Sequence, residues 1–124
     1  MTTESRRRAY RSGRWAETLC VLLLRLRGYR IVARGFRTPV GEIDIIAGRG
    51  GRLYFIEVKE RADLEAAREA VTPRQRRRIS RAAALFLARN PKYADWDAQF
   101  DVMLITPGRW PVRIQNAWSV EDPA

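Results

Sequence analysis

The chain has 124 residues, with 24 Lys and Arg against 14 Asp and Glu, so its formal net charge is +10. This length suits a single domain, and a content of 46% hydrophobic and 31% charged residues is typical of a globular protein. The absence of histidine excludes catalytic triads and imidazole metal sites, and a single cysteine excludes an intramolecular disulfide or a cysteine-rich zinc site.

Hydropathy indicates no membrane segment, because no apolar run approaches the roughly 18 residues of a spanning helix. The N-terminus shows no signal-peptide pattern, so we expect a cytoplasmic protein without a membrane partner.

Cys20 lies in a leucine-rich stretch and is expected to be a small buried hydrophobic residue. Only two of the basic residues are lysines, Lys59 and Lys92, which points to a specific role for Lys59 or to chance.

Charge is distributed in four alternating blocks. Residues 1–40 carry a net charge of +8, residues 41–72 carry −2, residues 73–92 carry +7 and residues 93–124 carry −3. Basic clusters attract phosphate backbones regardless of sequence. An acidic segment between two basic segments opposes such binding, unless its carboxylates hold a cation or lie elsewhere on the surface.

We expect one domain, residues 1–124, in which residues 1–8 form a flexible basic tail. Apolar residues from Ala16 to Leu26 recur at helical spacing, which predicts a helix over 12–27 that ends at Gly28. Strands are predicted at 29–34, 42–47 and 53–59, with a loop at 35–41 and a glycine-rich turn at 48–51.

The second half of the chain contains a short predicted helix at 64–70 and a longer one from Pro73 to about Arg89, capped by Thr72. Strands at 99–105 and 112–118 complete the pattern. The main elements therefore follow the order α-β-β-β-α-β-β, which predicts an α/β fold with a mixed sheet flanked by helices.

Two strands carry acidic residues among apolar ones. Because strand side chains alternate, Glu57 and Lys59 share a face, and so do Glu42 and Asp44. A hairpin that pairs Ala47 with Tyr54 also places Asp44 opposite Glu57, with β-carbons about 5 Å apart. A divalent cation such as Mg²⁺ or Mn²⁺ would relieve the repulsion between the two carboxylates.

Lys59 lies about 6.6 Å beyond Glu57 on the same face. Its ammonium could contact an attacking water or a scissile phosphate, so this constellation suits phosphodiester hydrolysis without histidine. A solvent-facing strand with a weak ion pair would show the same Glu-x-Lys spacing.

Residues 41–61, GEIDIIAGRGGRLYFIEVKER, resemble the PD-(D/E)xK nuclease motif. Together with RSGRWAE upstream and QFDVMLI downstream, they resemble the bacterial family UPF0102 (YraN), which is related to archaeal Holliday-junction resolvases. The resemblance covers residues 12–118. It implies a restriction-endonuclease-like fold and a metal-dependent nuclease, and it raises the expectation of a homodimer, although the sequence itself marks no dimer interface.

The resemblance also implies individual roles. Asp44 and Glu57 match the metal-binding carboxylates, and Lys59 matches the lysine of the motif. Glu17 matches the additional acidic residue of resolvase-type members, as a third metal ligand and catalytic residue. From the sequence alone, an ordinary surface glutamate is an equally good interpretation of Glu17. Gln75 matches a polar position at which related proteins often carry lysine, and it is expected among the nucleic-acid contacts.

Several arginines are candidate nucleic-acid contacts. Four fall on one stripe of the 73–89 helix, without an acidic residue nearby, and a solvated helix face is the alternative. These are Arg74, Arg77, Arg78 and Arg81. Arg14 belongs to a second group near the N-terminus, with Arg6, Arg7, Arg8 and Arg11, which forms either a phosphate-binding arm or a tail.

Two further acidic residues and the four tryptophans also have expected roles. Asp101 is a lone acid in a hydrophobic strand and is expected to anchor a buried polar network, while Glu42 is expected to support the site. Trp110, in a turn, could stack on a base. Most tryptophans are largely buried, so the other three are expected in the core. These are Trp15, Trp96 and Trp118.

Three functions are therefore open. The first is a Mg²⁺-dependent nuclease acting on DNA, branched DNA included. The second is a non-catalytic DNA- or RNA-binding module of the same fold. The third is a scaffold whose arginines bind an acidic protein. A metal site that depends on Asp44 and Glu57 distinguishes the first from the second.

Overall fold

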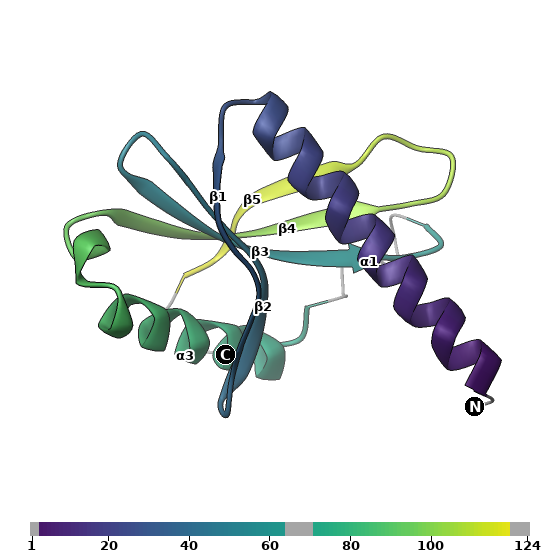
Figure 1. The fold of residues 1–124 in the computed structure, drawn as a ribbon, viewed down its shortest axis with the longest axis horizontal. Helices are drawn as coiled ribbons and strands as arrows, with labels where there is room; N and C mark the ends of the chain where they lie inside the picture. The colour runs from purple at the N-terminus through teal and green to yellow at the C-terminus, as the bar shows by residue number, and fades with distance from the viewer. Residues whose placement is uncertain (1–2, 64–70, 120–124) are drawn as a thin grey trace.

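The computed structural model describes residues 3–63 and 71–119, with side chains from residue 14 onward. Its elements follow the predicted order of one helix, three strands, one helix and two strands (Figure 1). They are α1 (Thr3–Leu26), β1 (Arg30–Thr38), β2 (Gly41–Arg49), β3 (Arg52–Glu60), α3 (Pro73–Arg89), the 3₁₀ turn η1 (Pro91–Tyr93), β4 (Asp97–Ile105) and β5 (Val112–Trp118).

The five strands form one mixed sheet in the order β1-β2-β3-β4-β5. β3 and β4 pair in parallel, and the other neighbouring strands pair antiparallel. The parallel pair requires a crossover, and α3 lies within that crossover. The prediction of an α/β fold with a mixed sheet flanked by helices is confirmed.

Both faces of the sheet are covered (Figure 1). α1 buries Ala16, Cys20, Val21 and Leu24 against one face. α3 buries its apolar stripe, from Ile79 to Phe86, against the other face together with aromatic residues of β3, β4 and β5. Cys20 is fully buried, as predicted, and burial raises the pKa of its thiol to about 12.

Local signals set the element boundaries that the sequence predicted. Gly28 adopts a φ of 85° after α1, and the Tyr29 N–H donates to the Leu24 carbonyl at 2.9 Å. At the start of α3, the Thr72 hydroxyl accepts from the Gln75 N–H, while the Gln75 side chain accepts from the Thr72 N–H. This capping box satisfies two backbone donors at the start of the helix.

Two predicted boundaries are wrong. Residues 35–38 continue β1 instead of forming a loop, because Gly35 takes a φ of 59° within the strand and the connection shortens to a turn closed by the Thr38 hydroxyl. α1 begins at Thr3 and not at residue 12, so it includes most of the expected tail, whose arginines are good helix formers. The predicted helix at 64–70 lies outside the described residues.

The tryptophan predictions are confirmed only in part. Trp118 is buried and Trp110 is 83% exposed, as expected. Trp15 is 64% exposed and Trp96 is 36% exposed, so placing them in the core was wrong. Trp15 lies one residue, and hence about 100°, away from the buried Ala16, on the outer side of α1. Neither helix, within the described residues, has an apolar stretch long enough to cross a membrane.

Candidate active site

The candidate site lies where β2 and β3 separate. Their ladder pairs Ala47 with Tyr54, as predicted, and ends at Ile45 and Ile56. Beyond that point the Asp44 Oδ2 atom accepts a hydrogen bond from the backbone N–H of Val58 at 2.8 Å. The Asp44 side chain thus satisfies a strand donor that the departing β2 backbone leaves open.

Asp44 and Glu57 lie side by side at this separation point, and a hydrogen bond joins their carboxyl groups. Burial and the neighbouring Asp44 charge raise the pKa of Glu57 to about 9. Burial also raises the pKa of Asp44, against the hydrogen bonds from Glu57 and Val58. The raised pKa values of both groups favour a proton or a cation beside the two carboxyl groups.

Lys59 accompanies this pair, as the alternation of β3 predicts. Its Nζ atom lies 3.7 Å from Glu57 Oε1. The side chains of Lys59 and Glu57 are only 12% and 14% exposed, so their interaction is poorly screened by solvent. The structure brings together Asp44, Glu57 and Lys59 from the predicted constellation.

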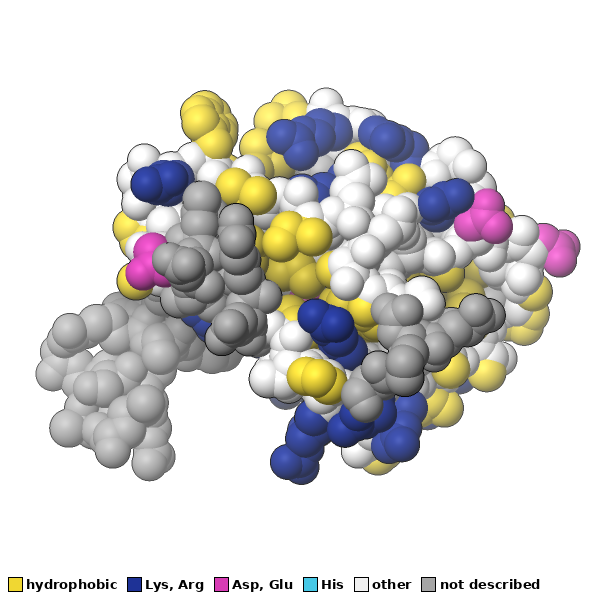
Figure 2. Space-filling view, turned by 180° about the vertical axis from the view of Figure 1, so that it is seen from behind, with side chains coloured by type: hydrophobic (Ala, Val, Ile, Leu, Met, Phe, Trp, Pro, Cys, Tyr) yellow, Lys and Arg dark blue, Asp and Glu magenta, His cyan; other side chains and the backbone are white. Residues whose placement is uncertain are grey.

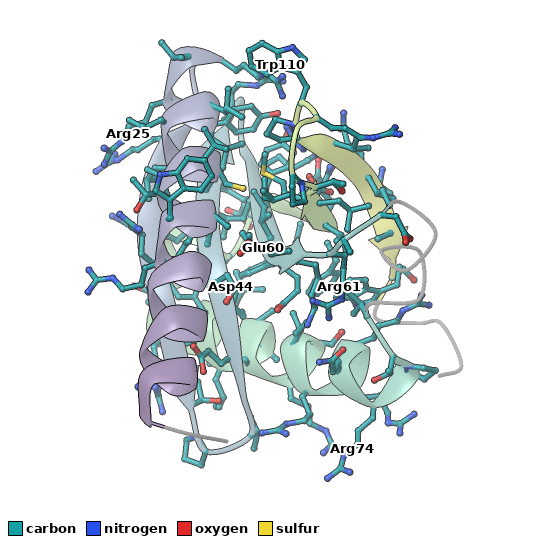
Figure 3. The ribbon with its side chains drawn as sticks, turned by 90° about the vertical axis from the view of Figure 1, so that its right-hand side faces the viewer. Arg25, Asp44, Glu60, Arg61, Arg74 and Trp110 are labelled. Atoms are coloured by element: carbon teal, nitrogen blue, oxygen red, sulfur yellow. The ribbon has the colours of Figure 1, made fainter. Side chains whose placement is uncertain are left out.

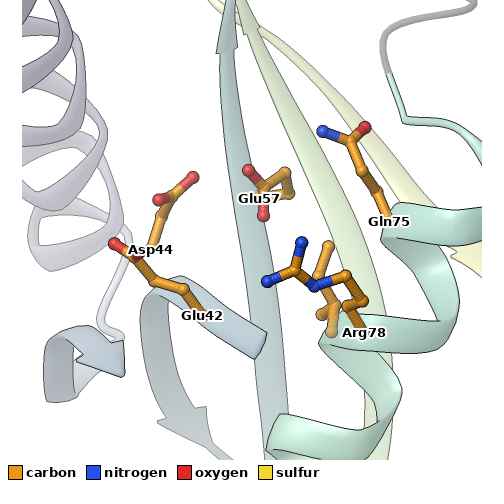
Figure 4. Close-up of a pocket in the computed structure, with 6 residues that line it drawn as sticks. Glu42, Asp44, Glu57, Gln75 and Arg78 are labelled. Carbon is orange, nitrogen blue, oxygen red and sulfur yellow. The ribbon is translucent and has the colours of Figure 1, made fainter. Parts of the chain in front are cut away.

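The pair faces a cavity of about 290 Å³ between β2, β3 and α3 (Figure 4). Glu42 and Arg78 line it as well, and Figure 4 shows the Arg78 guanidinium pointing toward the carboxylates. α3 can approach closely because Gly41 has no side chain: a β-carbon there would clash with the Arg78 carbonyl. The cavity thus combines acids from two strands with a cation from the helix.

Gln75 also lines this cavity, opposite Glu57 (Figure 4). Its side-chain oxygen is already engaged in the capping box of α3. Gln75 therefore helps to set the position of the helix end beside the carboxylates. This structural role is one that the sequence did not predict for Gln75, although the Thr72–Gln75 spacing is the pattern of a capping box.

The other predicted arginines of α3 point to solvent. Arg74, Arg77 and Arg81 are exposed, as is Arg78 at the rim of the cavity. Basic side chains gather at the lower edge of the face in Figure 2, where Figure 1 places α3. The helix therefore presents an exposed basic surface, the α3 arginine face (Arg74, Arg77, Arg78 and Arg81), directly beside the carboxylates.

Glu17 approaches the site from the other side of the sheet. It accepts from Arg34 Nε at 3.1 Å, and Arg34 also donates to Thr18. Its charge acts on Asp44 by raising the pKa of that group. Glu17 and Asp44 both line a second cavity, of about 600 Å³, that Arg14 and Arg37 also border. In Figure 3 Asp44 lies between α1 and α3.

Sequence reasoning missed Arg34 and Arg37, which border this second cavity from β1. Arg37 lies in the predicted loop at 35–41 and Arg34 directly before it, so the sequence does not indicate that both lie beside β2. Arg37 pairs with Glu42 across the β1–β2 ladder, with a distance of 3.6 Å between Nε and Oε1. The signal was present in the opposite charges at these two positions. The side chains of Arg6, Arg7, Arg8 and Arg11 lie outside the described part of the chain.

The donor set fits a hard divalent cation. Among the residues with described side chains, no three acids or cysteines form a ready-made ligand cluster. Mg²⁺ commonly uses one or two carboxylates and completes its coordination with waters and phosphate oxygens. Asp44 and Glu57 meet that requirement, and the raised pKa of Glu57 indicates a position at which a proton or a cation is favoured.

Asp101 takes the structural role that the sequence predicted. It is completely buried and accepts hydrogen bonds from Gln99, from the Asn116 N–H, and from Arg113 at 2.7 and 2.9 Å. Arg113 also donates to the Tyr29 hydroxyl. This network joins β4 to β5 and leaves Asp101 outside the candidate site.

Comparison with known proteins identifies the family. The family model "Uncharacterised protein family UPF0102" matches residues 16–105. A UPF0102 protein of Parvibaculum lavamentivorans is 57% identical over 110 residues, covering 89% of this chain and 83% of that protein. A UPF0102 protein of Chelativorans sp. is 48% identical over 115 residues, covering 93% of each. The matched region contains Glu17, Asp44, Glu57 and Lys59, and the chain belongs to the UPF0102 family.

Proposed function

We propose that this protein is a metal-dependent nuclease of the bacterial cytoplasm that hydrolyses phosphodiester bonds in DNA, branched DNA included. The observation that carries the proposal is the half-buried Asp44–Glu57 carboxyl pair with Lys59 beside it. Two carboxyl groups in hydrogen-bonded contact are unfavourable in a fold unless a proton or a cation lies with them. The α3 arginine face next to the pair supplies the positive charge that a polyanionic substrate requires.

Each residue of the site has its own role in this proposal. Asp44 and Glu57 would hold Mg²⁺ or Mn²⁺, which when bound supplies Lewis acidity toward a phosphate oxygen and toward water. Lys59 stabilises the negative charge that develops on the phosphate, or orients the attacking water. Arg78 binds a phosphate oxygen from the α3 side of the cavity. Glu17 acts through its charge on Asp44.

The outer arginines position the nucleic acid. Arg74, Arg77 and Arg81 contact the backbone without reading bases, and Arg14 does so from α1. Such contacts set affinity and register, while they carry no sequence information. The substrate is therefore held between the two helices that flank the separation of β2 and β3.

Cleavage assays test the proposal. Supercoiled plasmid and a four-way junction are incubated with Mg²⁺, Mn²⁺ or EDTA, using the wild type and the Asp44→Asn and Lys59→Ala variants. Metal-dependent cleavage should disappear in both variants, while Asp97→Asn, which changes an exposed acid at the far end of β4, should retain it. Cleavage that persists in Asp44→Asn and Lys59→Ala would refute the assignment of the site.

The second candidate is a non-catalytic DNA- or RNA-binding module. The ion pair between Glu17 and Arg34 favours the binding module. Arg34 engages Glu17, the acid that is expected to serve as the third metal ligand in a nuclease. Tight nucleic-acid binding with no cleavage in either metal, and binding unchanged in Asp44→Asn, would select this function over the nuclease.

A further inference from the structure

A third cavity, of about 320 Å³, opens at the turn between β2 and β3. We call it the turn cavity. Its walls come from the start of β1, the end of β2 and the segment that follows α3. Gly48 in its wall lies four residues from Asp44 along β2, or about 13 Å. The turn cavity is therefore separate from the candidate active site.

An aromatic surface forms one wall. The Trp96 and Tyr93 rings pack edge to face, with centroids 4.8 Å apart at an interplanar angle of 83°. The other support of Trp96 is Gly48, where an added β-carbon would lie 3.2 Å from the indole ring. Trp96 is thus held between a core tyrosine and the β2 backbone while 36% of its surface stays exposed. A rigid, exposed indole is a suitable platform for a stacked base.

The lining is also cationic. Arg30, Arg49 and Lys92 border the cavity, and none of the described residues that line it is acidic. Arg49 donates a hydrogen bond to the Arg27 carbonyl, and its guanidinium lies over the Tyr29 ring. Within the described residues, Arg30 and Lys92 have no carboxylate partner in an ion pair. The Lys92 ammonium lies 5.1 Å from the Tyr93 ring centre, which places positive charge beside the aromatic wall.

We propose that the turn cavity binds one nucleotide, with its base on Trp96 and its phosphate between Arg30 and Lys92. A planar group and an anion joined in one ligand match the aromatic and cationic walls, and the volume lies in the usual range of small-ligand sites. The nucleotide is either free or part of a single strand. This inference goes beyond the proposed nuclease, because it uses none of the residues of the candidate active site.

Binding to the full-length protein tests the inference. AMP, adenosine, inorganic phosphate and a four-nucleotide DNA strand are titrated at constant ionic strength and followed by NMR chemical shifts. AMP should bind more tightly than adenosine or phosphate, because only AMP uses both walls. A strand that binds more tightly than AMP identifies the source as nucleic acid, and the reverse identifies a free nucleotide. Phosphate that binds as tightly as AMP would overturn the proposal.

Variants locate the binding. Trp96→Ala should weaken AMP binding about 5- to 150-fold, the effect of losing one stacked base. Lys92→Gln, a change at an exposed side chain, should weaken the binding of AMP and not of adenosine. Trp15→Ala is the matched control, since it removes an exposed tryptophan from α1. Asp44→Asn should bind AMP normally, which separates this inference from the proposed nuclease. Unchanged affinity in Lys92→Gln would refute the inference even if Trp96→Ala failed to fold.

Discussion

The Asp44 carboxylate accepts a hydrogen bond from the Val58 N–H, at 2.8 Å, where the backbones of β2 and β3 part. A side chain here replaces the strand pairing that would otherwise continue. The same aspartate faces the Glu57 carboxyl, so one residue both ends the ladder and builds half of the acidic pair. Asp44 is consequently held in place by the fold before any cation binds.

Glu57 should make folding stability dependent on pH. Its pKa is raised in the folded protein to about 9, so the folded state retains a proton that the unfolded state loses above about pH 4.5. Stability therefore falls as pH rises between these two values, by up to about 1.4 kcal/mol per pH unit. The Glu57→Gln substitution removes this fall in stability, and the glutamine side chain can still donate a hydrogen bond to Asp44.

Urea unfolding across about pH 5 to pH 9, without divalent metal, measures the effect. Glu57→Gln should be increasingly more stable than the wild type as pH rises. Asp97→Asn, an exposed acid, should follow the wild type over the same range. Parallel stability curves for Glu57→Gln and the wild type would contradict a raised pKa at Glu57.

Divalent cations should stabilise the wild type by occupying the acidic pair. At a concentration 100 times its Kd, a ligand that binds only the folded state adds about 2.7 kcal/mol. In Asp44→Asn this stabilisation should be lost, although the asparagine oxygen can still accept from Val58. Thermal unfolding in MgCl₂ or MnCl₂, against NaCl of equal ionic strength, measures the difference. Equal gains in both proteins would place the cation elsewhere.

The α3 arginine face should control the salt dependence of DNA binding. Arg77→Gln should weaken binding and reduce the slope of log K against log salt by about 1, the loss of one phosphate contact. Arg89→Gln is the matched control, because Arg89 is exposed on the last turn of the same helix. Titrations of a short duplex at several salt concentrations give both slopes, and equal slopes would place the DNA away from this face.

Arg78 should behave differently from its neighbours, since its guanidinium points toward Glu57 (Figure 4). Arg78→Gln should reduce the rate of cleavage more than it reduces DNA affinity. Comparing single-turnover rates with binding constants for Arg78→Gln and Arg77→Gln separates the two roles. Equal losses of rate and affinity in the two variants would make Arg78 one more backbone contact.

The buried Asp101–Arg113 pair should be essential for stability and not for chemistry. Asp101→Ala leaves the half-buried Arg113 without its carboxylate and should cost about 3–5 kcal/mol of unfolding free energy. The double variant Asp101→Leu with Arg113→Met removes both charges and should lose less. Urea unfolding measures both, and a larger loss in the double variant would show that packing outweighs charge at this position.

Much of the fold followed from local patterns. The capping sequence at Thr72, the glycine after α1 and the alternation in β3 predicted where these elements begin or end. The hairpin register followed from the glycine-rich turn, and with it the proximity of Asp44 and Glu57. The sequence did not predict that Gly35 continues β1 with a positive φ, because a glycine is equally typical of a turn and of an irregular strand.

The sequence by itself determined the element order, the acidic pair with its lysine and the basic stripe of α3, because each depends on spacing within one or two neighbouring elements. Only the tertiary structure decided that Arg34 pairs with Glu17, that Arg78 turns toward Glu57 and that Trp96 stays at the surface. These relationships join elements far apart in the chain. They depend on how helices pack on a twisted sheet, and periodicity within a single element carries no information about that packing.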